Sequence, residues 1–251
     1  MGKEIRLNRF IARSGLCSRR KADEYIRQGL VKVNGQTITQ LGVRINPLKD
    51  RVEVDRETIA PIREERRLLY LAMNKPRGII TSLRDPQGRQ TIVHILPLSL
   101  QGKGIVPIGR LDYHSEGLLL LSNDGEFVHR MSHPRFHLKK KYLVEIEGVP
   151  SAHTLAIMRK GMFLKGLRKR LAPVGVDVKK RLGPSRYLLL FTLVQGINRQ
   201  IRRMCEQWGW KVTRLIRIQQ GPIALGNLAP GEIRPLNSLE IKRCKAMIGL
   251  L

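Results

Sequence analysis

Cysteine and acidic residues are scarce in this chain of 251 residues, and each scarcity excludes a class of protein. The three cysteines, Cys17, Cys205 and Cys244, are widely spaced and odd in number. They argue against a disulfide framework and a zinc ribbon, and they fit a reducing compartment. Only 20 Asp and Glu oppose 47 Lys and Arg, so the formal net charge is +27. A chain this basic repels itself unless an anion is near, and the usual anionic partner is nucleic acid.

Long apolar runs are also missing. The longest, residues 187–194, is far shorter than the roughly 20 residues that span a bilayer, and the first residues lack the apolar core of a signal peptide. No long basic amphipathic helix favours a membrane surface either. Hydrophobic residues nevertheless make up 42% of the chain, which is enough for a packed core. The sequence therefore predicts a soluble, cytoplasmic, nucleic-acid-binding protein with no membrane partner.

The N-terminal segment has the pattern of two short helices followed by short strands. An apolar helical face begins at Leu7 and stops near Gly15, and Ser18 is expected to cap a second helix that closes at Gly29. Alternating valines then lead into Asn34-Gly35, the pattern typical of a tight hairpin. We expect this segment to fold as a small unit of its own.

Basic residues form two groups on the predicted helices. They are Arg6, Arg9 and Arg13 on the first helix, and Arg19, Arg20 and Lys21 at the start of the second. The positive end of a helix with three cations suits a phosphate group. One such group alone would fit a solvated basic face equally well, but two groups on adjacent helices favour binding to RNA or DNA.

These N-terminal features resemble the S4 RNA-binding domain. The matching strings are Leu7-Asn8-Arg9-Phe10-Ile11-Ala12, Ser14-Gly15, Cys17-Ser18-Arg19-Arg20-Lys21-Ala22-Asp23 and Val33-Asn34-Gly35. The resemblance implies a small α/β domain over residues 5–62 that binds RNA. It does not imply an activity.

The rest of the chain, after a charged stretch at 63–67 that we expect to end a linker, has a mixed α and β pattern. Strands are expected at 68–73, 118–121, 142–147 and 215–218, and a helix is expected from Ile201 to Trp208, ending at Gly209. Residues 237–251 fit a further helix. Strands outnumber helices and several are joined by short turns, so the sequence predicts an α+β fold. Its sheet should be mixed but largely antiparallel, with helices packed on it.

Metal and nucleotide motifs are absent. His133 and His137 have a spacing that can bind zinc on a helix, but Pro134 lies between them and disfavours that helix. The sequence has no H-E-x-x-H motif, Walker loop, dinucleotide fingerprint or G-x-S-x-G elbow. We therefore expect no bound metal.

Two other segments carry groups suited to chemistry. Asp112 follows Arg110 in a glycine-bounded loop before an apolar run, although an isolated Asp in such a loop more often forms a turn or caps a helix. Further along, a Gly-Asn turn precedes the helix predicted from Ile201. Arg199, Arg202 and Arg203 project from the start of that helix, away from its apolar face.

Together these segments resemble the pseudouridine synthases of the ribosomal branch that contains RsuA, RluB, RluE and RluF, and most closely the RluF type. The matching segments are Asn74-Lys75-Pro76-Arg77-Gly78, Gly109-Arg110-Leu111-Asp112 with Ser115 and 117–125, Lys141-Tyr142-Leu143-Val144, and 198–210. Lys141 departs from the pattern, because the branch commonly has Glu there. An S4-like segment in front is also the order that this branch uses.

The resemblance implies isomerisation of a uridine in ribosomal RNA, expected in the large subunit, by a catalytic domain over residues 67–245 without a cofactor. It implies that Asp112 is the essential carboxylate, that Arg202 is its partner, and that Tyr142 stacks on the flipped uracil. It also implies that RNA is bound by basic residues of both domains. These residues are Lys75, Arg77, Arg110, Arg199 and Arg203 with Arg9, Arg13, Arg19, Arg20 and Lys21. We expect a monomer.

Alternatives stay open at this point. The same chemistry on tRNA or small-subunit rRNA is one alternative to the large-subunit target. A non-catalytic RNA-binding or ribosome-assembly protein is also consistent with the basic composition, and Asp112 would then be dispensable. A sequence-specific DNA-binding protein is disfavoured, because a basic helix pair explains only the N-terminal segment.

Overall fold

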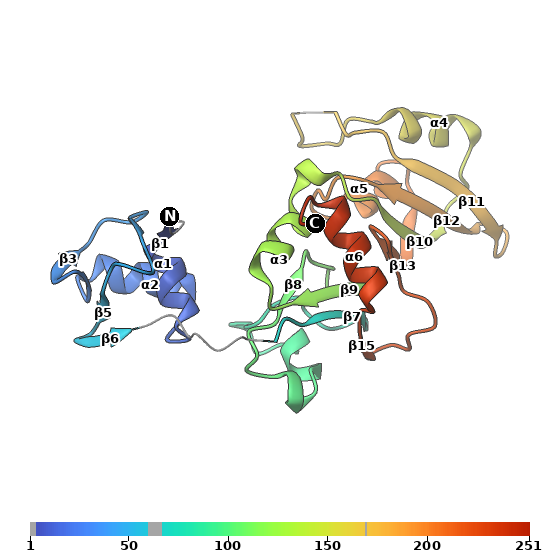
Figure 1. Ribbon diagram of the computed structural model, residues 1–251. Helices are drawn as coiled ribbons and strands as arrows, with labels where there is room; N and C mark the ends of the chain where they lie inside the picture. Colours follow the sequence, from blue (N-terminus) through green and yellow to red (C-terminus); the bar gives the residue numbers. More distant parts are fainter. Residues whose placement is uncertain (1–3, 60–66, 169) are drawn as a thin grey trace. The chain divides into compact units, whose positions relative to one another are not determined.

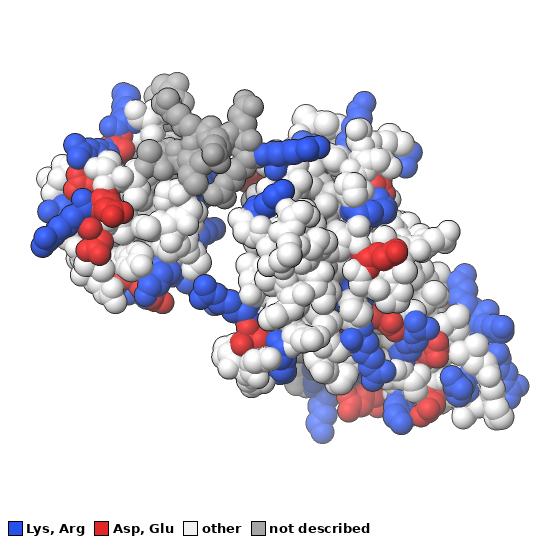
Figure 2. All heavy atoms as spheres, turned by 90° about the horizontal axis from the view of Figure 1, so that it is seen from below, with Lys and Arg blue, Asp and Glu red and all other residues white. Residues whose placement is uncertain are grey.

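The chain folds as two units in the computed structural model, which describes residues 4–59, 67–168 and 170–251. The N-terminal unit is Met1–Arg67 and the C-terminal unit is Leu68–Leu251 (Figure 1). Apart from Arg67, the charged stretch expected at 63–67 lies outside the described residues. Basic side chains are spread over both units on the face shown in Figure 2. None of the described helices is long and apolar enough to cross a bilayer.

The N-terminal unit packs two helices against short antiparallel strands, as the sequence predicts. The helices are α1 (Leu7–Arg13) and α2 (Arg19–Arg27). Strands β2 (Val31–Val33), β3 (Gln36–Ile38), β5 (Val52–Val54) and β6 (Glu57–Ile59) form one sheet in the order β3-β2-β5-β6, and β1 (Ile5–Arg6) pairs with β4 (Arg44–Ile45). The core is apolar and nearly solvent-free, with Phe10 and Ile11 of α1 packed near Ile26 of α2.

Local sequence determines where these elements begin and turn. Ser18 is the N-cap of α2, and its hydroxyl accepts a hydrogen bond from the backbone N–H of Lys21. Asn34 and Gly35, between β2 and β3, both have positive φ (51° and 82°), which a two-residue hairpin turn of this hand requires. Both predictions are confirmed.

The C-terminal unit is built on a nine-stranded sheet with the order β11-β12-β10-β13-β9-β7-β15, in which β14 pairs with β13 and β8 with β9. The strands are β7 (Tyr70–Lys75), β8 (Val106–Ile108), β9 (Glu116–Ser122), β10 (Lys140–Glu147), β11 (Gly175–Arg181), β12 (Arg186–Leu193), β13 (Lys211–Gln220), β14 (Ile223–Ala224) and β15 (Ile233–Pro235). All the strand pairs are antiparallel except β13 with β9, so the predicted mixed, largely antiparallel sheet is confirmed.

Helices cover the two halves of this sheet separately. They are α3 (Gly125–Ser132), α4 (Ala152–Lys160), α5 (Gln200–Glu206) and α6 (Ser238–Met247), with short 3₁₀ helices at Ile92–Ile95, Leu98–Leu100 and Pro134–Phe136. Residues of α4 and α5 share a core with β10 and β12, whereas residues of α3 and α6 share one with β7 and β9 (Figure 1). Helix α5 ends at Glu206, before the expected Trp208.

Strands β7 and β9 are buried on both faces, which explains their continuous apolar sequence. Leu118 and Leu120 point into the core shared with α3 and α6. Leu119 and Leu121 point into a separate core on the other face, which includes Ile92. A strand that is covered on both sides shows an uninterrupted apolar run in place of alternation.

The three cysteines lie in different surroundings. Cys205 and Cys244 are buried in the two cores of the C-terminal unit, and burial raises the pKa of each thiol to about 12. Cys17 is half-buried beside the core of the N-terminal unit. No two of them form a disulfide.

The two halves of the large sheet meet where β9 runs parallel to β13. The register pairs Glu116 with Ile216 and Gly117 with Arg217. Gly117 has φ +100°, and a Cβ built there would overlap the backbone of Arg217. Only glycine therefore allows the two strands to approach this closely.

We predict that Gly117→Ala lowers the free energy of unfolding by at least about 3 kcal/mol, because backbone strain and overlap add. Gly102→Ala is the matched control: Gly102 also has positive φ (+73°), but nothing lies within 4 Å of the new Cβ. That change should cost about 1 kcal/mol. Urea unfolding of the three proteins measures both values, and equal losses would contradict the close-approach explanation.

Candidate active site

A cavity of about 500 Å³ lies in the C-terminal unit and brings distant segments of the sequence together. Its lining includes Asp112 from the loop between β8 and β9, Tyr142 from β10, and Arg199 and Arg202 from the start of α5. This volume is typical of pockets that hold a small molecule or one nucleotide base. The two motifs that the sequence singled out, about ninety residues apart, therefore line one site.

Asp112 is half-buried, and its loop is fixed by hydrogen bonds on both sides. The hydroxyl of Thr81 donates to the carbonyl of Leu111 (2.8 Å), and the backbone N–H of Gly78 donates to the carbonyl of Tyr113 (2.8 Å). The N–H of Ser115 closes a turn onto the carbonyl of Asp112 itself (3.0 Å). The carboxylate thus stands on a rigid loop at the wall of the cavity.

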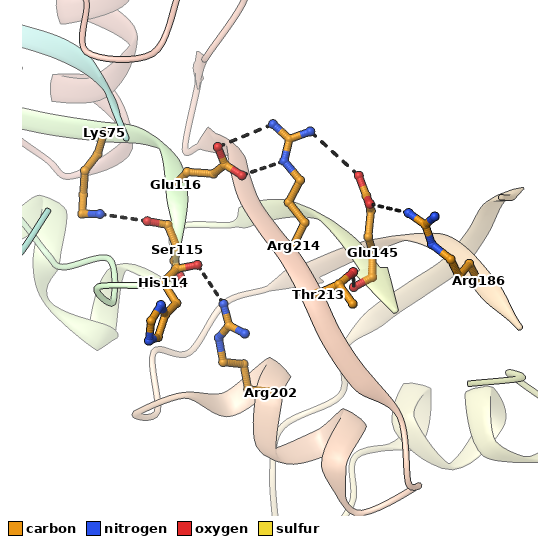
Figure 3. Close-up of polar contacts among 9 residues, drawn as sticks. All are labelled: Lys75, His114, Ser115, Glu116, Glu145, Arg186, Arg202, Thr213 and Arg214. Atoms are coloured by element: carbon orange, nitrogen blue, oxygen red, sulfur yellow. Dashed lines mark hydrogen bonds and ion pairs between the residues drawn. The ribbon is translucent and has the colours of Figure 1, made fainter. Parts of the chain in front are cut away.

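The side chain of Arg202 holds this loop by a hydrogen bond to a backbone carbonyl group of the loop. Its guanidinium donates to the carbonyl of His114 (3.0 Å) and to that of Val212 (3.3 Å) (Figure 3). Burial, and then the charge of Arg199, lower the pKa of Arg202, whereas Asp112 opposes this shift. Arg202, the expected partner of Asp112, is close enough for the two charges to interact, but no direct ion pair joins these two described residues. The charge of Asp112 acts on Arg202 from a longer distance.

Lys75 holds the same loop through a second set of hydrogen bonds to backbone carbonyl groups. It is fully buried at the end of β7, and its ammonium group donates to the carbonyls of Ser115 and Pro76, both at 2.8 Å (Figure 3). Burial lowers the pKa of Lys75 to about 8, partly opposed by Asp112 and Glu116. The expectation that Lys75 contacts phosphate does not fit this structure, because its charged group is inside the protein.

Tyr142 lies half-buried on β10, where it faces the cavity and also packs against two of the apolar cores. The register pairs it with Arg217 of β13. The site thus combines a carboxylate on a fixed loop with an aromatic ring on a strand. These are the groups that hold a flat ring and act on an atom next to it.

A family model for RNA pseudouridylate synthases matches residues 69–207, which include Asp112, Tyr142 and Arg202. The chain belongs to this family. A second model, for the S4 domain, matches residues 5–52. The protein is therefore an RNA-modifying isomerase with an S4 RNA-binding domain in front, as the motifs led us to expect.

Relatives match this synthase over nearly all of its length. The ribosomal large subunit pseudouridine synthase B of Bacillus subtilis is 36% identical over 247 residues, covering 96% of each chain. The dual-specificity RNA pseudouridine synthase RluF of Escherichia coli K12 is 38% identical over 237 residues, covering 94% of this chain and 77% of its own. A crystal structure of a pseudouridylate synthase superposes with a TM-score of 0.69 at 32% identity, covering 96% and 99% of the two chains.

Most of the basic residues predicted to bind RNA in this synthase are exposed. Arg77, Arg110 and Arg199 are exposed, and the last two line the cavity. Arg203 is half-buried and donates to the carbonyl of Lys165 (2.7 Å).

The basic residues of the S4 domain differ in how free they are. Arg13, Arg19 and Arg20 are exposed, and Arg9 is half-buried. Lys21 is exposed but pairs with Glu24 at 2.8 Å. Arg19 and Arg20 at the start of α2 are therefore the clearest candidates for phosphate contact.

Sequence reasoning missed several polar residues that line the same cavity, among them Lys140, Arg217 and Gln220. Arg217 is only 2% exposed and Gln220 only 1%. The strand predicted at 215–218 contained one usable signal. An arginine at an inward position of an alternating strand is rare unless a partner or a ligand meets it.

The depressed pKa of Lys75 predicts how stability depends on pH. The folded protein releases this proton near pH 8 and the unfolded chain near its ordinary 10.5, so burial of the charge destabilises the fold below pH 8 and ceases to do so above 10.5. Relative to Lys75→Met, the wild type should gain up to about 3 kcal/mol across this window. Urea unfolding of both proteins at several pH values measures the gain. Parallel pH curves would contradict the assignment.

Proposed function

We propose that this synthase converts one uridine of large-subunit ribosomal RNA to pseudouridine, with Asp112 as the essential carboxylate. The observation that carries the proposal is that Asp112 and Tyr142 line one cavity in a chain of this family. The name of the Bacillus subtilis relative, a ribosomal large subunit pseudouridine synthase, supports this target.

The reaction breaks the bond between N1 of the base and C1′ of the ribose, turns the base, and joins C5 to C1′. The proton on C5 leaves and N1 gains one, so no atoms are gained and no cofactor is required. Asp112 either attacks C1′ or removes a proton from the sugar, and both routes need its ionised form. In this proposal Arg202 acts as a positioning residue, because it holds the carbonyl of His114.

The base must leave its helix or loop before Asp112 reaches C1′, which costs a few kcal/mol of unstacking. Tyr142 would stack on the extruded uracil and offset part of this cost, and its hydroxyl would assist removal of the C5 proton. Arg110 would occupy the gap left in the RNA. Arg77, Arg199 and Arg203 would contact phosphates, which position the RNA without recognising its sequence.

The domain bounds 5–62 and 67–245, action as a monomer and a cytoplasmic location belong to the same proposal. So does RNA binding by Arg9, Arg13, Arg19, Arg20 and Lys21 of the S4 domain. A second class of RNA target, for which tRNA is our candidate, is consistent with the dual specificity named for the Escherichia coli relative.

We predict that the wild type forms one new pseudouridine in ribosomal RNA isolated from cells that lack this protein. Asp112→Asn should lower the rate at least about 100-fold, because the amide neither attacks C1′ nor accepts a proton. Pseudouridine mapping of the ribosomal RNA identifies the position, and a tRNA pool is mapped in parallel. Filter binding ensures that both proteins are compared at equal occupancy. An equally active Asp112→Asn protein would exclude the carboxylate role, and no product on any RNA would favour a non-catalytic protein.

We also predict that Arg19→Ala with Arg20→Ala weakens RNA binding in a salt-dependent way. Loss of two phosphate contacts should lower the slope of log K against log salt by about 2, because fewer counterions are released on binding. Arg27→Ala, at the opposite end of α2, is the matched control and should leave the slope unchanged. Titrations at several salt concentrations measure it. An unchanged slope in the double variant would exclude these two arginines as phosphate ligands.

A further inference from the structure

The floor of the cavity carries two buried polar atoms that have no hydrogen-bond partner in the protein. They are Nη2 of Arg217 and Oε1 of Gln220, on side chains that are 2% and 1% exposed. Arg217 is anchored at its other end, where Nε donates to the carbonyl of Leu118 (2.6 Å). Both side chains belong to the lining of the same cavity, one with an unpaired donor and the other with an unpaired acceptor.

A β-bulge puts both side chains on one face of the sheet. Residues three apart on a regular strand point to opposite faces. Here Tyr142 of β10 pairs with Arg217, but Lys141 pairs with Gln219, so Ile218 is an extra residue without a partner on β10. The extra residue turns Gln220 to the face that already carries Arg217. Lys140 and Tyr142, their partners in the register, line the cavity with them.

The surroundings of Arg217 make a ligand oxygen favourable. The nearest charges that act on it include Lys75 and Lys140, whose pKa values it helps to lower. No carboxylate lies within ion-pair distance of it among the described residues. A buried guanidinium without an acceptor for Nη2 costs several kcal/mol, which an incoming oxygen would largely recover.

We infer that Arg217 and Gln220 recognise the imide edge of the uracil. Nη2 of Arg217 donates to a ring carbonyl next to N3, and Oε1 of Gln220 accepts the hydrogen on N3. The inference rests on the proposed function, since it concerns the base that enters this cavity. A phosphate has only acceptor oxygens and would leave Oε1 of Gln220 unpaired, whereas the imide edge satisfies both atoms.

The turn of the base during the reaction gives Arg217 and Gln220 a second role. The ring exchanges N1 for C5 when it turns half a revolution about the line through N3 and C6. That turn leaves the N3 hydrogen in place and exchanges the two carbonyl oxygens, O2 and O4. The same donor and acceptor therefore fit the base before and after it turns, and they retain the base while its bond to the ribose is broken.

The test is a binding comparison with synthetic RNA hairpins that carry the mapped target position as uridine, 3-methyluridine or an abasic site. All proteins carry Asp112→Asn, so the uridine hairpin is bound without turnover. Without a further change, the protein should bind the uridine hairpin at least about 10-fold more tightly than the 3-methyluridine hairpin, which lacks the N3 hydrogen. Adding Gln220→Leu should abolish that difference while affinity for the abasic hairpin stays unchanged.

Two further variants separate recognition from folding. Gln220→Glu keeps an acceptor oxygen and should keep the preference for uridine. Gln219→Leu is the matched control, because Gln219 is the neighbouring residue and its amide donates to the carbonyl of Gly221 (2.9 Å). It should change none of the three affinities.

The inference is wrong if Gln220→Leu keeps the preference for uridine. It is also wrong if Gln220→Leu lowers the affinity for the abasic hairpin as much as the affinity for the uridine hairpin. Either result leaves the proposed function standing. Failure of the proposed function has a different signature, because the wild type would then yield no pseudouridine to map, and this inference would fall with it.

Discussion

The close approach of β9 to β13 is the contact on which the rest of the catalytic unit depends. Gly117 lies against the backbone of Arg217 in a parallel pairing between two otherwise antiparallel halves of the sheet. The loop with Asp112 leads into β9, and one face of β13 lines the cavity. A side chain at Gly117 would separate the two strands, and with them the loop of Asp112 from the face of β13 that lines the cavity.

Two cations fix the catalytic loop through its carbonyl groups and leave the carboxylate free. Lys75 holds Ser115 and Arg202 holds His114, which lie on either side of one peptide bond (Figure 3). Charge-assisted hydrogen bonds to carbonyls are strong, so the loop is rigid without a direct ion pair to Asp112. In the proposed reaction, a carboxylate oxygen that is not bound to a guanidinium keeps its lone pairs for the ribose.

Local patterns predicted much of this structure, because local interactions determine it. The Ser18 cap, the Asn34-Gly35 turn and the apolar runs of β7 and β9 each depend on neighbours along the chain or on simple burial. The errors concern contacts between distant segments. Nothing near Lys75 in the sequence shows that its ammonium group is buried against Ser115, forty residues away. The bulge at Ile218 is equally invisible, since it exists only relative to β10. Motif resemblance found Asp112 and Tyr142, but it did not reveal what their neighbours contact.

The environments of the three thiols have a practical consequence. A maleimide or a disulfide reagent attacks the thiolate, and Cys205 and Cys244 are both buried and hold their protons to about pH 12. Cys17 is the most accessible of the three and lies at the turn before α2, next to the basic start of that helix. Cys17 is therefore the preferred attachment point for a fluorophore or spin label beside the basic start of α2, with no cysteine removed.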